Sequence, residues 1–417
     1  MTTFAEKTDN PLRKIWEGPK IDPNKDKKLI TLQIGDPTAF GNFYAAKESI
    51  EAIKNALEKD NFSYTVSSGL KAAREAVASY VNNNDKSVQV NDSDKCFDVN
   101  SEDVIMSNGC STALEICFRA LANPRENILV PRPSWNYSTW LEPTEIVSKF
   151  YNLDCTRNWE IDLEHLESQI DESTRAILVN NPGNPCGNVF SKEHILKILE
   201  IAEKHQIPII ADEVYEFFTF PGIEFYSFSS LSKNVPILTC SGLTKRFIMP
   251  GIRVGWIVIH DRNNQLNDIR KGLLNIAGRN FWPNSTAQIA LTEIIKNTPK
   301  AFLEENAARV HDHALSAYKI LRETPGLIPI FPRGGMYIMI KIELEKFPKF
   351  KTCLEFTQQL IREQSVATFP GYPCFNFPGF FRIVLTVPKE LIIEACERIK
   401  EFCEQNCKQS EKYLKSG

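Results

Sequence analysis

Short runs of branched apolar residues alternate with amphipathic segments through the middle of the chain. The apolar runs begin at Asp103, Asn127, Arg175, Ile207, Val235 and Gly255. Apolar residues recur with the helical period of 3.6 over residues 111–121 and 191–205. Strands and helices that alternate in this way predict an α/β fold, with a mostly parallel sheet covered by helices on both faces. Such sheets bind ligands at the carboxyl ends of their strands.

The pattern changes after about residue 300. It predicts a long amphipathic helix through the three hundreds, two strands in LIPIFPRGGMYIMIKI, a helix over 351–363, a strand in FFRIVLTV and a last helix over 388–404. We therefore predict an N-terminal arm over 1–30, a large domain over 45–305, and a smaller α+β domain made of 31–44 and 306–417. The polar runs at 82–85 and 92–102 are predicted to be loops.

Composition and charge exclude several classes of protein. The 417 residues carry a formal net charge of -3 and 24% charged residues, so neither a nucleic acid nor an anionic membrane surface is the expected partner. The N-terminus mixes both charges, and no apolar run is long enough to cross a membrane. The eleven cysteines include no CxxC pair, which is typical of a reducing compartment. We expect a soluble cytoplasmic protein.

Three cysteines near the C-terminus could share one face of a helix, since Cys396, Cys403 and Cys407 are spaced seven and four apart. Buried free thiols are favoured over a metal site because no histidine lies nearby in the sequence to complete a ligand set. No metal site is predicted.

The segment SGLTKRFIMPGIRVG sets Lys245 eight residues before Arg253 in apolar, glycine-punctuated surroundings. An amine held in a site can form a Schiff base with an aldehyde, and an arginine can bind a phosphate at two points. Pyridoxal phosphate carries both groups. The alternative is that both residues are ordinary surface cations, since the chain has 49 lysines and arginines.

Other chemically apt side chains follow the predicted strands directly. Asp212 and Tyr215 follow IPII, where a carboxylate could pair with a pyridinium nitrogen and a phenol could bind the ring's 3-oxygen. A helix-capping Asp and a packing Tyr explain them equally well. The turn NNPGNPCG contains two Asn-Pro pairs, and Asn184 in it could direct its amide into a cleft.

A phosphate site is predicted where SNGCSTAL begins a helix. Gly109, Cys110 and Ser111 would present backbone N–H groups there, and with Arg253 they could neutralise a phosphate dianion. A routine helix cap explains the serine as well. Trp135 follows another strand and could stack on a flat ring, or could belong to the core.

An arginine within the apolar strand FFRIVLTV needs an anionic partner. For Arg382 the natural partner is a substrate carboxylate, with a structural Asp or Glu as the competitor. Gly35, in IGDPT, and Tyr64, in NFSYTVSSGL, precede the predicted sheet and are further candidates.

Taken together, these residues resemble the fold-type I pyridoxal-phosphate enzymes of the aspartate aminotransferase superfamily, and within it the tyrosine aminotransferases. The resemblance extends from IGDPTAFGN through NNPGNPCGNVFSK, ADEVY, GLTKRFIMPGIRVGW and GGMYIM to RIVLTVP.

The resemblance implies a role for each candidate. Lys245 would carry the Schiff base and then transfer protons. The cofactor would be held by Gly109, Cys110, Ser111, Trp135, Asn184, Asp212, Tyr215 and Arg253, with Tyr64 reaching it from the other subunit of a homodimer. Arg382, helped by Gly35 and Asn184, would bind the substrate's α-carboxylate.

The implied activity is ping-pong transamination of L-tyrosine with 2-oxoglutarate to 4-hydroxyphenylpyruvate and L-glutamate, the first step of tyrosine catabolism. A related aminotransferase for phenylalanine, alanine, aspartate or kynurenine remains an alternative, and Arg279 is the nearest candidate for a second carboxylate contact. A nicotinamide-dependent dehydrogenase is disfavoured because no two glycines are spaced two apart, so GxGxxG is missing. A non-catalytic regulator is disfavoured by the complete residue set.

Overall fold

Eight strands form the main sheet of the computed structural model, which describes residues 1–18, 20–59, 62–84, 98–279 and 283–408. The strands in spatial order are β2 (Val104–Ser107), β9 (Gly255–His260), β8 (Ile237–Gly242), β7 (Ile209–Asp212), β6 (Thr174–Asn180), β3 (Asn127–Arg132), β4 (Val147–Asp154) and β5 (Glu160–Ile161). β8, β7, β6, β3 and β4 run parallel, whereas β9 is antiparallel to both of its neighbours. The predicted, mostly parallel sheet is confirmed.

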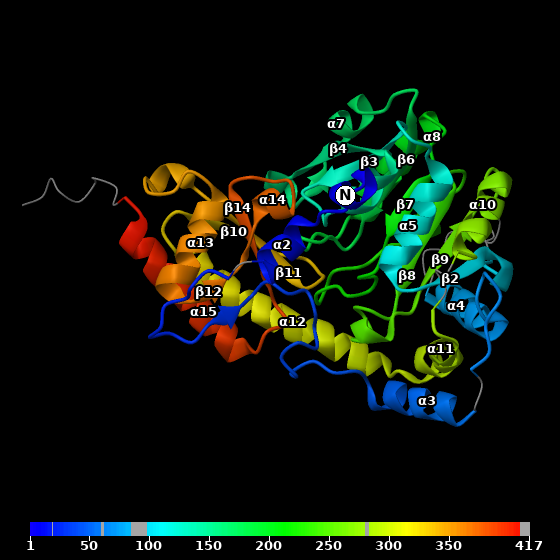
Figure 1. Ribbon diagram of the computed structural model, residues 1–417, viewed down its shortest axis with the longest axis horizontal. Helices are drawn as coiled ribbons and strands as arrows, with labels where there is room; N and C mark the ends of the chain where they lie inside the picture. Colours follow the sequence, from blue (N-terminus) through cyan, green and yellow to red (C-terminus); the bar gives the residue numbers. More distant parts are fainter. Residues whose placement is uncertain (19, 60–61, 85–97, 280–282, 409–417) are drawn as a thin grey trace, which may run out of the picture.

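Helices cover both faces of this sheet (Figure 1). α5 (Cys110–Leu121) and α10 (Asn267–Ala277) lie on one face, where Ile210 and Leu238 join their core. α8 (Lys192–Lys204) covers Ile177 and Ile209 on the other face, and α4 (Lys71–Asn84) and α11 (Ser285–Asn297) cover Val258. The two helices predicted over 111–121 and 191–205 are confirmed as α5 and α8.

A second, antiparallel sheet follows later in the chain, with the order β10 (Leu327–Ile330), β11 (Tyr337–Ile342), β14 (Phe380–Val384) and β13 (Phe369–Pro370). β1 (Ile30–Thr31) pairs in parallel with β12 (Val366–Ala367). The helices α13 (Cys353–Gln364) and α15 (Lys389–Asn406) accompany these strands. Every element predicted after residue 300 is therefore confirmed.

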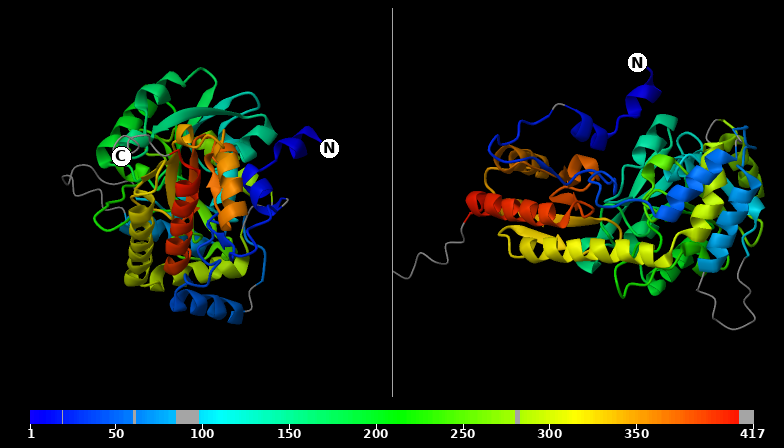
Figure 2. Two further views of the ribbon diagram at one scale, coloured as in Figure 1. Left: turned by 90° about the vertical axis from the view of Figure 1, so that its left-hand side faces the viewer. Right: turned by 90° about the horizontal axis from the view of Figure 1, so that it is seen from below.

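The long helix α12 (Lys300–Leu321) joins the two regions (Figure 2). Its first turns place Leu303 against the core under α4 and α11, and its last turn buries Leu321 in the core that contains β10 and α15. The predicted boundary between 305 and 306 falls inside this helix, and the division into an arm and two domains stays a prediction.

The remaining helices are short or lie at the periphery. They are α1 (Thr3–Lys7), α2 (Pro11–Glu17), α3 (Lys47–Glu58), α6 (Ser138–Leu141), α7 (Leu163–Ser168), α9 (Phe228–Leu231) and α14 (Gly371–Cys374), with 3-10 turns η1 (Ser101–Asp103), η2 (Glu142–Thr144), η3 (Cys155–Arg157), η4 (Pro250–Ile252) and η5 (Leu344–Lys346). No helix in the described ranges is long and apolar enough to cross a membrane.

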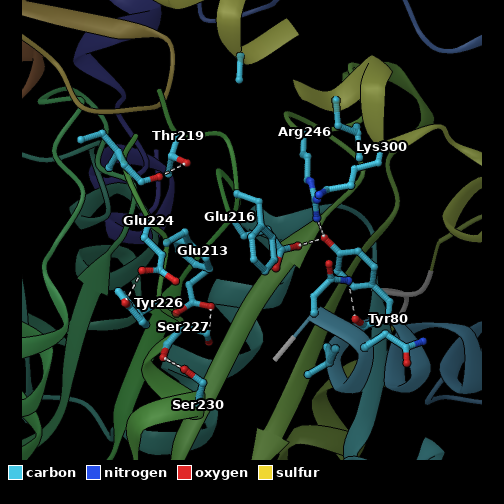
Figure 3. Close-up of a pocket in the computed structure, with 18 of the residues that line it drawn as sticks. Tyr80, Glu213, Glu216, Thr219, Glu224, Tyr226, Ser227, Ser230, Arg246 and Lys300 are labelled. Atoms are coloured by element: carbon cyan, nitrogen blue, oxygen red, sulfur yellow. Dashed lines mark hydrogen bonds between the residues drawn. The ribbon is translucent and has the colours of Figure 1, made fainter. Parts of the chain in front are cut away.

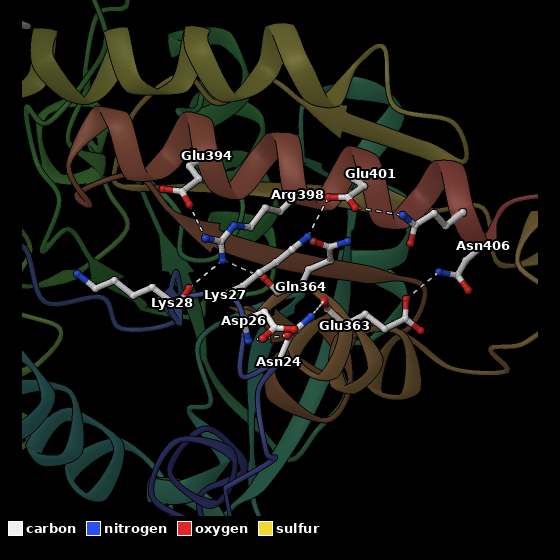
Figure 4. A network of polar contacts seen from close by, with 11 residues as sticks. Asn24, Asp26, Lys27, Lys28, Glu363, Gln364, Glu394, Arg398, Glu401 and Asn406 are labelled. Atoms are coloured by element: carbon white, nitrogen blue, oxygen red, sulfur yellow. Dashed lines mark hydrogen bonds and ion pairs between the residues drawn. The ribbon is translucent and has the colours of Figure 1, made fainter.

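Polar contacts fix the segment before β1 onto α13 and α15 (Figure 4). Lys27 Nζ donates to Gln364 Oε1 at 2.5 Å and lies 3.0 Å from Glu401 Oε2. Asn24 Nδ2 donates to the Glu363 carbonyl at 2.9 Å, and Arg398 Nη1 donates to the Lys28 carbonyl at 2.8 Å. These contacts hold β1 beside β12 and so determine where the following residues, including Gly35, enter the molecule.

Two sequence expectations differ from the structure. The polar run at 82–85 was expected to be a loop, but Asn82, Asn83 and Asn84 form the last turn of α4, where the Asn82 side chain bonds both backbone groups of Val99 at 2.9 and 3.1 Å. Residues 85 and 92–97 of the two expected loops lie outside the described residues. β4 was not predicted, because its exposed and half-buried residues give it no continuous apolar run.

Candidate active site

Asp212 ends β7 at the carboxyl edge of the sheet and is buried. The Tyr137 hydroxyl donates to its Oδ2 at 2.7 Å, the Cys110 thiol donates to its Oδ1 at 3.5 Å, and the Val214 amide donates to the same oxygen at 3.3 Å. Burial raises the pKa of Asp212, and the hydrogen bond from Tyr137 opposes that rise. Sequence reasoning missed Tyr137, although it lies only two residues after Trp135.

The beginning of α5 forms a cradle with Arg253. The first amide groups of a helix have no acceptor within the helix, so those of Cys110 and Ser111 are available to an anion. Gly109 has a φ of +82°, and a Cβ there would lie 2.6 Å from Arg253 Nη2. A Cβ on Gly255 would lie 2.6 Å from the Cys110 nitrogen. Two glycines therefore allow the guanidinium and the helix terminus to meet.

Lys245 follows β8 and is half-buried. Its Nζ donates a hydrogen bond to the carbonyl of Gly35 and lies 5.9 Å from the centre of the Tyr215 ring. Within the described part of the chain it has no carboxylate partner. Lys245 and Gly35, which were predicted separately for the cofactor and the substrate, thus meet although 210 residues separate them.

Tyr215 is buried and its hydroxyl lies 2.8 Å from that of Tyr337, the first residue of β11. A Cβ on Gly35 would come within 2.2 Å of the Tyr337 hydroxyl, so only glycine allows this approach. Burial raises the pKa of Tyr215 well above its usual value. Tyr337 was not predicted as a site residue. The sequence feature that could have identified it is GGMYIM, where a glycine pair comes shortly before an apolar strand.

Arg382 lies in the middle of β14 and is 2% exposed. Its Nη1 donates to Asn184 Oδ1 at 2.9 Å, and its Nη2 donates to the Gln33 carbonyl at 2.5 Å. The guanidinium also lies 4.2 Å from the centre of the Tyr337 ring. Its Nε has no hydrogen-bond partner, and no described carboxylate pairs with it. A buried guanidinium whose partners are all neutral is suited to a carboxylate ligand, so the competing explanation, a structural Asp or Glu, has no support.

The other predicted residues are placed differently. Trp135 is half-buried and joined to the site, because its amide donates to the Asn184 carbonyl at 3.0 Å. Its ring lies 5.4 Å from that of Tyr137. Tyr64 is 94% exposed and lies outside the site of its own chain. Arg279 is exposed after the end of α10 and has no contact with these residues.

The arrangement fits pyridoxal phosphate. The cradle at Gly109, Cys110 and Arg253 presents N–H donors and a cation, which a phosphate requires. Asp212 offers a buried carboxylate for a protonated ring nitrogen, and Lys245 offers an amine. The unpartnered Nε of Arg382 marks a separate position for a second anion.

Comparisons with known proteins agree with this fit. The family described as Aminotransferase class I and II matches residues 27–399. The tyrosine aminotransferase of Mus musculus is 45% identical over 406 residues, which cover 97% of this chain and 87% of that protein. The Homo sapiens tyrosine aminotransferase is 44% identical over the same shares of both chains.

Solved structures give the same answer. The tyrosine aminotransferase from Leishmania infantum has a TM-score of 0.91 at 30% identity and covers 98% of both chains. An alanine aminotransferase from Pyrococcus furiosus has a TM-score of 0.88 at 28% identity, over 97% of this chain and 100% of that one. The fold class and the resemblance expected from the sequence are confirmed. The chain belongs to the class I and II aminotransferases and is a transaminase that depends on pyridoxal phosphate.

Proposed function

We propose that this transaminase converts L-tyrosine and 2-oxoglutarate into 4-hydroxyphenylpyruvate and L-glutamate, and so begins tyrosine catabolism. The observation that carries the choice of tyrosine is the identity of 38 to 45% with tyrosine aminotransferases over nearly the whole chain. The alternatives named from the sequence are not favoured, because the five most similar curated relatives that we compared are all tyrosine aminotransferases.

Bound pyridoxal phosphate supplies an aldehyde that condenses with amines and a ring that accepts electrons from a substrate carbon. Asp212 would keep the ring nitrogen protonated, since a buried carboxylate stabilises a neighbouring positive charge. Gly109, Cys110, Ser111 and Arg253 would hold the phosphate. Tyr215 and Asn184 would bind the ring's 3-oxygen, and Trp135 would cover the ring.

Lys245 would act as the base and then the acid of the reaction. Its Nζ would take the proton from the α-carbon of the amino acid and deliver it to the 4'-carbon of the cofactor. The Gly35 carbonyl accepts a hydrogen bond from Nζ and therefore holds the amine beside the segment that follows β1. This contact supports a role for Gly35 in aiming the amine as well as in shaping the substrate site.

Arg382 would bind the α-carboxylate that both substrates share. Nη1 and Nη2 each use one N–H on Asn184 or Gln33, so the Nε–H and a second N–H on each Nη remain for a two-point contact with the ligand. Because the amino acid and the oxo acid both carry this carboxylate, one site can serve both half-reactions in turn. The second carboxylate of 2-oxoglutarate would need a further cation, for which Arg279 is the candidate.

We infer that the enzyme works as a homodimer with shared sites. Apolar side chains between residues 44 and 66 are unusually exposed, among them Tyr44 at 60%, Phe62 at 65%, Tyr64 at 94% and Val66 at 64%. A concentration of exposed apolar surface is typical of an interface. A second copy would cover it, and Tyr64 would reach the phosphate of the partner's cofactor.

We also infer a cytoplasmic location and the division into an arm (1–30), a large cofactor-binding domain (45–305) and a small domain (31–44 and 306–417). The cysteines in the described ranges are all free, which agrees with a reducing compartment. Figure 1 separates the two sheets in space, which supports the division.

The visible spectrum of the purified holoenzyme tests the proposed function. Adding L-tyrosine without an oxo acid should bleach the cofactor band once, and adding 2-oxoglutarate should restore it. Initial rates with tyrosine, aspartate, alanine and kynurenine then rank the donors. If aspartate turns over far faster than tyrosine, the proposed substrate is wrong.

A further inference from the structure

A second cavity of about 770 Å³ lies apart from the candidate active site. Side chains from the end of α4, the segment after β7, the strand β8 and the beginning of α12 line it (Figure 3). None of the residues assigned above to the cofactor or the substrate is among them. The cavity therefore requires an explanation of its own.

Adjacent residues of the same chain segments line the cavity and the active site. Asp212 belongs to the active site, whereas the next residue, Glu213, lines the cavity. The same holds for Tyr215 and Glu216 and, after β8, for Lys245 and Arg246. In each pair, adjacent side chains serve different sites.

The buried side chains of Glu216 and Arg246 both form a hydrogen bond with one hydroxyl group in the cavity, that of Tyr80. Tyr80 donates to Glu216 Oε1 at 3.1 Å and accepts a hydrogen bond from Arg246 Nη1 (Figure 3). Ser241 donates to the same Glu216 oxygen at 2.8 Å. In the described part of the chain, no direct ion pair joins Glu216 to Arg246. The Tyr80 hydroxyl thus lies between the two groups; burial raises the pKa of Glu216, and the nearby charge of Arg246 opposes that rise.

Among the described residues, two buried polar groups of the lining, on Arg246 and Thr239, have no hydrogen-bond partner. Arg246 is 9% exposed and its Nε–H has no acceptor, and Thr239 is 6% exposed and its hydroxyl has no partner. Buried polar groups in proteins are almost always hydrogen-bonded, so an unpaired donor and an unpaired hydroxyl in one lining are available to a polar ligand. Glu213, by contrast, is occupied by the Ser227 hydroxyl at 2.7 Å and the Phe228 amide at 2.9 Å.

The rest of the lining is mixed, and its apolar part lies beside Arg246 and on α12. The Arg246 guanidinium lies 4.5 Å from the centre of the Phe217 ring, and that ring lies 4.9 Å from the ring of Phe225. Leu303 and Ala307 of α12 face the same space. At the rim, Lys300 pairs with Glu304 at 3.1 Å, so these two charges neutralise one another.

We propose that this cavity is a second ligand site and that it takes an α-amino acid with an apolar side chain, bound as the zwitterion. The ammonium group would face Glu216, the carboxylate would accept from Arg246 Nε and Thr239, and the side chain would lie against Phe217 and Phe225. A ligand with two negative charges is disfavoured because one of them would lie against Glu216, and a ligand with two positive charges because one would lie against Arg246. A wholly apolar ligand would leave both buried charged side chains without a counter-charge.

The test counts molecules of L-phenylalanine bound per chain by equilibrium dialysis, with the cofactor-loaded Lys245→Ala variant so that no turnover occurs. We expect two molecules per chain, one in each site. Adding Ala308→Trp, an exposed position of α12 on the cavity lining, should reduce the number to one. Ala301→Trp, an exposed position of the same helix away from the lining, is the matched control and should leave two.

A second variant keeps the shape of the cavity. Glu216→Gln, in the same Lys245→Ala background, should weaken the second binding event about tenfold or more while the first stays unchanged, because a neutral amide binds an ammonium group less tightly than a carboxylate does. One molecule per chain in the starting variant, bound with unchanged affinity in Ala308→Trp and Glu216→Gln, would overturn the proposal. So would two molecules with unchanged affinities in both of these variants. One molecule per chain that is lost in Ala308→Trp would instead identify the second site alone and count against the proposed function.

Discussion

The Tyr137 hydroxyl donates a 2.7 Å hydrogen bond to the Asp212 carboxylate, and both side chains are buried. The bond favours the ionised carboxylate that a protonated ring nitrogen requires, in an environment that otherwise favours the neutral acid.

Replacing Tyr137 by Phe should therefore raise the pKa of Asp212 further. We expect kcat to fall about tenfold, which corresponds to the loss of one hydrogen bond to a charged group, and the acidic limb of the pH–rate profile to move to higher pH. The matched control is Tyr151→Phe, which removes an equally buried hydroxyl that bonds only the Leu178 carbonyl at 2.7 Å. An unchanged profile in Tyr137→Phe, or an equal shift in Tyr151→Phe, would argue against this role.

Lys245→Ala should still bind the cofactor noncovalently but lose turnover by about 10³-fold or more, because a positioned acid–base group contributes about 10² to 10⁴. Single-turnover kinetics with L-tyrosine measure the loss. Lys197→Ala, at an exposed position of α8, should keep the original rate. Retention of the original rate by Lys245→Ala would disprove the assignment of this residue.

Arg382→Lys should lower kcat/KM for tyrosine about a hundredfold, mainly through KM, because lysine cannot form the planar two-point contact that a carboxylate needs. The protein contacts to Asn184 and Gln33 cannot both be kept by one ammonium group. Arg398→Lys, at an arginine that binds backbone carbonyls near α13, should change stability but not KM. A similar loss in both variants would point to a purely structural role.

Gly109→Ala tests the phosphate cradle. The new Cβ would strain a backbone with φ +82° and would press on Arg253, so we expect the cofactor affinity of the apoenzyme to fall at least about tenfold. Gly272→Ala in α10 is the control, since no atom lies within 4 Å of its Cβ position and alanine favours a helix. Fluorescence titration of the apoenzymes with pyridoxal phosphate compares them, and equal affinities in both variants would contradict the prediction.

His260 should make the folded protein sensitive to acid. Burial lowers its pKa from 6.5 to about 3, so between these two values the unfolded chain binds a proton that the folded chain does not. This contribution leaves stability intact above pH 6.5 and lowers the free energy of unfolding by about 1.4 kcal/mol per pH unit as the pH falls toward 3. Denaturant unfolding of the wild type and of His260→Gln between pH 7 and 4 should show a difference that shrinks as the pH falls. A difference that does not change with pH would contradict the prediction.

Sequence patterns predicted the fold closely because each core strand carries a continuous run of apolar residues that ends at a polar turn. β4 was not predicted because its exposed and half-buried residues give it no continuous apolar run. The triple asparagine at 82–84 was misread as a loop because tertiary contacts with Val99 outweigh the weak helix propensity of asparagine.

Most of the candidate site could be predicted for the same reason, since its residues follow strands whose ends must meet. The partners of those residues could not. Tyr137 reaches Asp212 across 75 residues, and Tyr337 reaches Tyr215 across 122, so neither contact leaves a local signal. Tyr64 is almost fully exposed, so its proposed role depends on a second chain.

The pairing of Ile30 with Val366 has a consequence for biosynthesis. A nascent chain released from the ribosome up to about residue 260 already contains Asp212, Lys245 and Arg253, and the strands that carry them are neighbours in the main sheet. The Gly35 segment cannot take its place until β12 has emerged, and Arg382 follows later still. During translation, the capacity to hold a phosphate is thus completed well before the capacity to select an amino acid.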